Sequence, residues 1–133
     1  MAKRTSTMLM LRGHTEEALN FYVTLFDGAQ ITYMDYFGPE DRIMKGKVRL
    51  AHIDLLGQSY LCTDSPFDPQ YPLTPAISIY VECTTKKEFK LLLDKLSVDG
   101  DNVVPVRKVD DKNHFGWVQD RFGLSWQINY AAG

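Results

Sequence analysis

An internal repeat constrains this chain more than any other feature of its sequence. Two segments, residues 15–26 and 85–96, each begin with a threonine and then place apolar side chains at helical spacing. Two later segments, residues 57–61 and 123–127, each begin with a glycine that separates two strand-like runs. Helix-like and hairpin-like segments recur in the same order, so the pattern predicts one supersecondary unit present twice.

Each half is expected to run strand, helix, strand, strand, strand. Apolar alternation and turn residues predict these strands at residues 5–11, 29–37, 48–55, 59–63, 76–83, 103–109, 115–119 and 124–130. Thr15 is expected to cap the first helix, and Thr85 with Glu88 has capping-box spacing at the second. Four of the six prolines lie within residues 65–75, which therefore read as an extended crossover between a module at about 5–64 and a module at about 76–130.

Neither module can cover its own sheet on both faces, so the two are expected to pair. The predicted fold class is α+β, with two βαβββ modules forming a curved, cup-shaped mixed sheet and the helices on the outside. The 133 residues suit one domain over residues 1–133, with 44% hydrophobic side chains available for a core.

Composition excludes several classes of partner. A net charge of -2 without a basic run argues against nucleic acid, and no apolar stretch is long enough to span a membrane. A cytoplasmic location is therefore expected. Cys62 and Cys83 form no CxxC pattern and are predicted to be buried, reduced core residues.

The segment 116–128 predicts a hairpin whose turn contains Asp120 and Gly123. In its second arm Trp126 and Ile128 alternate with polar residues, among them Gln127. Alternation places Trp126, with Tyr60 and Tyr80, on the helix side of the sheet, and places Gln127 on the opposite face.

Three stretches carry a resemblance to a known family: residues 16–22, residues 73–79 with Cys83, and residues 116–128. Together with the doubled unit they resemble the PhnB-like branch of the vicinal oxygen chelate superfamily, which includes glyoxalases, bleomycin-resistance proteins and extradiol dioxygenases. That branch has been labelled 3-demethylubiquinone-9 3-methyltransferase. A methyltransferase would need a glycine-rich cofactor turn, whereas Arg12-Gly13-His14 has one glycine.

The resemblance implies where a metal would bind, since enzymes of the superfamily hold a divalent ion with residues from four strands. The corresponding positions here are Thr7, Leu61, Ile77 (or Ala76) and Gln127. Only Gln127 is a plausible ligand, so no metal and no cofactor are expected. His52 and Asp54, two apart on one strand, are the alternative polar pair, while His14 and His114 are expected in exposed turns.

Two functions of different class follow. The first is a small-molecule-binding protein with a mostly apolar cup and no complete metal site. Its lining would comprise Thr7, Leu9, Leu61, Ile77, Ile79, Trp117 and Gln127. The alternative is a metal-dependent lyase, isomerase or dioxygenase using His52, Asp54 and Gln127. Because superfamily members pair modules within or between chains, a homodimer is also expected.

Overall fold

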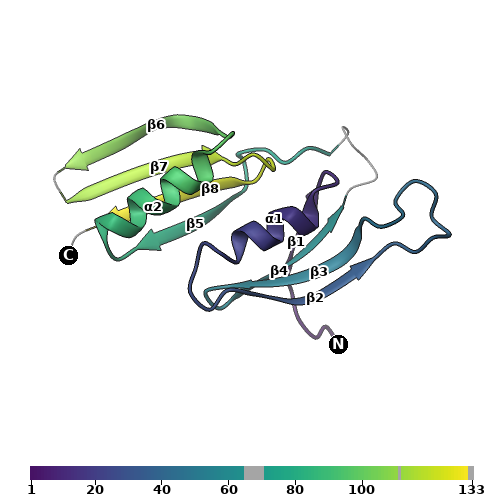
Figure 1. The fold of residues 1–133 in the computed structure, drawn as a ribbon. Coiled ribbons are helices and arrows are strands. Elements are labelled where there is room, and N and C mark those ends of the chain that lie inside the picture. The colour runs from purple at the N-terminus through teal and green to yellow at the C-terminus, as the bar shows by residue number, and fades with distance from the viewer. Residues whose placement is uncertain (65–70, 111, 132–133) are drawn as a thin grey trace. The chain divides into compact units, whose positions relative to one another are not determined.

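The computed structural model describes residues 1–64, 71–110 and 112–131. The chain forms two compact units, Met1–Pro72 and Leu73–Gly133, which we call module one and module two. Each contains a four-stranded mixed sheet and one helix in the order βαβββ (Figure 1). The predicted α+β fold built from a repeated unit is therefore confirmed. No helix within the described residues is long and apolar enough to cross a membrane.

Module one has the strand order β1-β4-β3-β2. Its elements are β1 (Thr7–Leu11), α1 (Thr15–Tyr22), β2 (Gln30–Tyr36), β3 (Val48–Leu55) and β4 (Gln58–Asp64). Strand β1 runs parallel to β4, while the other pairs are antiparallel. Helix α1 packs against β3 and β4. The core between helix and sheet includes Leu11, Leu19, Tyr22, Val48, Ile53 and Cys62.

Module two repeats this topology with the order β5-β8-β7-β6. Its elements are β5 (Ser78–Cys83), α2 (Lys86–Ser97), β6 (Asp101–Asp110), β7 (Asn113–Gln119) and β8 (Ser125–Ala131). Helix α2 packs on β5, β7 and β8. It lies so close to β7 that a Cβ at Gly116 would stand 3.0 Å from Leu93 Cδ1. The core includes Val81, Phe89, Leu92, Leu96, Val118, Leu124, Trp126 and Ile128.

The start of α1 differs from the prediction. Thr15 is the first helical residue, and the N-cap residue, His14, makes no side-chain capping bond. The capping acceptor is Asp64 at the end of β4: its Oδ1 accepts from Thr15 N at 3.1 Å and Thr15 Oγ1 at 2.6 Å. Its Oδ2 accepts from Val48 N at 2.8 Å, so one carboxylate, only 2% exposed, joins α1, β3 and β4. The three hydrogen bonds satisfy the oxygens of this buried side chain.

The cap of α2 and the turn between β7 and β8 agree with the sequence prediction, unlike the start of α1. Thr85 Oγ1 accepts from Glu88 N at 3.1 Å, which confirms the predicted cap of α2. The β7–β8 turn depends on Asp120, whose Oδ1 accepts from Phe122 N at 2.9 Å and Leu124 N at 3.0 Å. Gly123 has the expected positive φ of +92°. Helix α1, in contrast, ends at Tyr22, one turn earlier than its apolar stripe predicts.

Candidate functional site

The helix-free face of module two carries an aromatic and amide cluster around Gln127. Gln127 lies directly opposite Tyr80 on β5 and Trp117 on β7. Its neighbours Trp126 and Ile128 are fully buried on the α2 side. Because side chains alternate along a strand, Gln127, Tyr80 and Trp117 share the face away from the helix.

Two serines connect this cluster. Ser78 Oγ and Ser125 Oγ are 2.6 Å apart, and Trp117 Nε1 donates to Ser125 Oγ at 2.8 Å. Gln127 Nε2 donates to Ser78 Oγ over a long 3.4 Å. That is the one hydrogen bond of the Gln127 side chain within the described part of the chain, so its Oε1 remains available as an acceptor. The indole is held in a fixed orientation beside a weakly held amide. We call Ser78, Tyr80, Trp117, Ser125 and Gln127 the amide face.

The predicted partners of Gln127 on β5 were wrong by one residue. Ile79 pairs with Trp126 and therefore points toward α2, and Ile77 precedes the strand and is exposed. Tyr80, predicted on the helix side, instead lies beside Gln127 and is 55% exposed. The physical cause is the parallel register, which places Ser78 opposite Ser125 and so fixes the alternation along β5.

The predicted grouping on module one also needs correction. In the parallel β1–β4 pair, Thr7 lies opposite Tyr60 and Leu9 opposite Cys62. Leu9 and Cys62 are buried against the helix, whereas Leu61 lies on the other face. Thr7 and Leu9 therefore do not share a face with Leu61. Of the predicted lining residues, Leu61 lies on the helix-free face of module one, and Trp117 and Gln127 lie on that of module two.

His52 and Asp54 lie together on the helix-free face of module one. His52 is opposite Leu61 and Asp54 is opposite Ser59, whose hydroxyl is hydrogen-bonded to Asp54 Oδ1. The His52 ring centroid is 5.2 Å from that of Tyr33. Both residues line a cavity of about 570 Å³. Among the residues that the structure describes, no three His, Cys, Asp or Glu side chains are grouped to hold a metal ion.

Of the other two histidines, His14 lies where the sequence predicts and His114 does not. His14 is exposed beside α1, as predicted, with Nδ1 3.7 Å from Glu17 Oε2. His114, predicted in an exposed turn, lies in β7 and is only 8% exposed. Its ring centroid is 5.7 Å from that of Phe89 and 5.9 Å from that of Tyr130. The alternation of His114 with Gly116 and Val118 was the signal for this inward position.

The two cysteines are buried thiols whose environment disfavours nucleophilic chemistry. Cys62 and Cys83 are buried and carry free thiols, as predicted. Burial raises the pKa of each thiol to about 12, and the neighbouring Glu88 contributes for Cys83. Because the thiolate is the reactive form, neither residue supplies a nucleophile near neutral pH.

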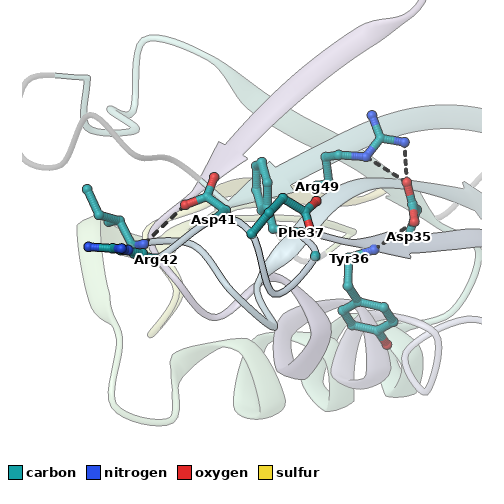
Figure 2. Close-up of a pocket in the computed structure, with 9 residues that line it drawn as sticks. Asp35, Tyr36, Phe37, Asp41, Arg42 and Arg49 are labelled. Atoms are coloured by element: carbon teal, nitrogen blue, oxygen red, sulfur yellow. Dashed lines mark hydrogen bonds and ion pairs between the residues drawn. The ribbon is translucent and has the colours of Figure 1, made fainter.

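A second cavity, of about 590 Å³, lies beside the loop that joins β2 to β3 (Figure 2). Two of its charged side chains bind each other, since Arg49 Nε donates to Asp35 Oδ2 at 2.7 Å. Asp41 Oδ1 accepts from the loop's own backbone, from Ile43 N at 3.1 Å and Met44 N at 2.9 Å. Figure 2 shows Arg49 and Asp35 pointing toward each other while Tyr36 points away. These contacts stabilise the loop, and they occupy the side chains of Asp35, Asp41 and Arg49.

Comparison with known proteins gives the family. Residues 3–129 match the family profile of 3-demethylubiquinone-9 3-methyltransferase. A PhnB protein from Bacillus cereus is 36% identical, with a TM-score of 0.89 over 97% of this chain and 100% of that chain. The search of curated proteins found no match.

More distant structures share the fold alone. A protein from Pseudomonas aeruginosa is 24% identical, with a TM-score of 0.80 over 99% of this chain and 100% of that chain. The fosfomycin resistance protein FosX from Listeria monocytogenes is 11% identical, with a TM-score of 0.66 over 99% of this chain and 96% of that chain. The chain therefore belongs to the 3-demethylubiquinone-9 3-methyltransferase family, the PhnB-like family whose motifs its sequence carries.

Proposed function

We propose that this protein binds a small molecule on the amide face of module two, with Gln127 as the polar anchor. The observation that carries the proposal is the weak hydrogen bonding of the Gln127 side-chain amide. The amide lies between two aromatic side chains, and its one hydrogen bond to a described residue is the 3.4 Å bond to Ser78. Aromatic surfaces with one or two fixed polar groups are typical of small-molecule sites.

The chemistry of the amide face favours a flat, largely apolar ligand with one polar group. Trp117 is oriented by its bond to Ser125, so its ring can stack on a ligand without losing further conformational freedom. Tyr80 offers a second ring and a hydroxyl, and Gln127 offers both a donor and an acceptor. A ligand carbonyl, hydroxyl or amide would complete the hydrogen bonds of Gln127.

Methyl transfer finds no support in the residues. The turn between β1 and α1 has one glycine, Gly13, and the first helical N–H of α1 donates to the Asp64 carboxylate. A glycine-rich turn that opens onto a helix, with its N–H groups directed at a cofactor, is what such enzymes need. The proposal is therefore binding without a methyl donor.

A fragment screen by thermal shift tests the proposal. Aromatic amides and phenols should raise the melting temperature of the parent protein and of Gln58→Leu, a matched change at an exposed glutamine on β4. They should lose most of that effect in Gln127→Leu. Equal shifts in all three proteins would refute the role of Gln127.

The alternative function is a metal-dependent lyase, isomerase or dioxygenase that uses His52, Asp54 and Gln127. Gln127 belongs to module two, whereas His52 and Asp54 belong to module one and line the same cavity. A borderline cation such as Zn²⁺ needs three or four donors, and this pair supplies two. Metal analysis of protein purified without chelator separates the functions. We expect less than stoichiometric Zn²⁺, Ni²⁺, Mn²⁺ or Fe²⁺, and one tightly bound ion per chain would favour the alternative.

A homodimer in the cytoplasm remains the expected state of the protein. The expectation rests on two points: superfamily members pair modules within or between chains, and prolines are frequent in residues 65–75, which lie partly outside the described residues. Light scattering at micromolar concentration should give twice the 15.2 kDa chain mass. A monomer mass would contradict it.

A further inference from the structure

The cavity beside His52 and Asp54 on module one has charged side chains that play no part in binding at the amide face. It lies on the helix-free side of the sheet, where His52, Asp54, Ser59 and Leu61 contribute strand side chains. Lys3 and Arg4, from the segment that precedes β1, line the same cavity. Its volume of about 570 Å³ is in the range of small-molecule sites.

The two cations at this cavity have no acidic partner among the described residues. Neither Lys3 nor Arg4 forms an ion pair or a hydrogen bond with any residue that the structure describes, although the chain has 17 acidic and 15 basic residues. The one acid of the lining, Asp54, is hydrogen-bonded through Oδ1 to Ser59. The lining therefore has two cations against one carboxylate, with hydroxyl groups and an imidazole beside them.

We propose that this cavity binds a phosphate monoester that carries hydroxyl groups. The Arg4 guanidinium presents paired N–H donors that match phosphate oxygens, and Lys3 adds a second positive charge. The His52 ring supplies another donor, and Asp54, which can only accept when ionised, suits a ligand hydroxyl. The cavity is much larger than a phosphate ion, so it has room for the organic part. The same two cations oppose a divalent metal at His52 and Asp54.

Calorimetric titration with glycerol 3-phosphate at low ionic strength tests the site. Saturable binding should weaken about tenfold or more in Lys3→Gln/Arg4→Gln. It should persist in Lys87→Gln/Lys90→Gln, which removes the same charge from exposed positions on α2. Residues 3 and 4 are exposed and precede the first strand, so the variant should keep the parent's circular dichroism spectrum.

Two further ligands and one further variant complete the experiment. Glycerol, which lacks the phosphate, should not bind, and glycerate should bind more weakly than glycerol 3-phosphate. Gln127→Leu should bind glycerol 3-phosphate as the parent does, because the proposed site is on module one. The proposal is overturned by equal affinity in the two double variants, by equal affinity for glycerate, or by no saturation up to about 10 mM.

Discussion

Replacing two adjacent residues of β8 should separate stability from binding. Trp126 is 0% exposed, packs beneath α2, and its Nε1 donates to Asp120 Oδ2 at 2.9 Å. Gln127 is half-buried on the opposite face, and its side chain makes one bond, of 3.4 Å, to the residues that the structure describes. Trp126→Ala should therefore destabilise the protein far more than Gln127→Leu.

The burial and hydrogen bonds of the two side chains set the expected loss of unfolding free energy in each variant. Truncating a fully buried tryptophan leaves a large cavity and typically costs about 3–5 kcal/mol. The lost indole N–H also leaves Asp120 Oδ2 without that donor, so we expect the upper part of this range. Gln127→Leu loses one weak hydrogen bond and keeps similar side-chain volume, so its cost should be below about 1 kcal/mol.

Urea unfolding followed by far-ultraviolet circular dichroism measures both changes. Trp126→Phe is the intermediate control, because it keeps a buried ring but removes the N–H that Asp120 accepts. Its free energy of unfolding should fall between those of the other two variants. If Gln127→Leu costs as much as Trp126→Ala, Gln127 faces the core and the strand register is refuted.

Three further predictions concern a buried carboxylate, a closely packed glycine and two buried thiols. Asp64→Ala leaves three buried donors without their acceptor and should cost about 3 kcal/mol or more by urea unfolding, and a loss below 1 kcal/mol would contradict its capping role. Gly100→Ala should lower the melting temperature sharply, since its Cβ would stand 2.5 Å from Gln119 O; an unchanged melting temperature would refute the close approach. Burial raises the thiol pKa of Cys62 and Cys83 from 9.0 to about 12, so the folded protein should resist iodoacetamide at about pH 8. Its free energy of unfolding should fall as pH rises from about 9 toward 12, because only the thiols of the unfolded chain ionise in that range. Rapid alkylation of the folded protein would contradict this prediction.

Features coded by neighbouring residues could be predicted from the sequence. The cap formed by Thr85 and Glu88, and the turn made by Asp120 and Gly123, depend on residues three or four apart. The repeated order of helices and hairpins follows from the same local patterns. These agree with the structure because each signal is complete within a few residues.

Features set by residues far apart in the chain could not be predicted from the sequence. Strands β1 and β5 pair in parallel with strands far along the chain, and their apolar residues allow either face. Leu9 and Ile79 were consequently assigned to the wrong face. Asp64 was missed as the cap of α1 because it lies 49 positions from Thr15, and sequence spacing gives no sign of that contact.

The two tryptophans allow the most direct test of ligand binding at the amide face, because the chain contains only two indole N–H groups. Trp117 Nε1 lies on the amide face, whereas Trp126 Nε1 is buried against Asp120. In a ¹⁵N-labelled sample titrated with a fragment from the thermal-shift screen, the Trp117 indole and Gln127 side-chain amide signals should shift and saturate together. The Trp126 indole signal should remain in place. A shift of Trp126 with Trp117 and Gln127 unmoved would contradict a binding site on this face.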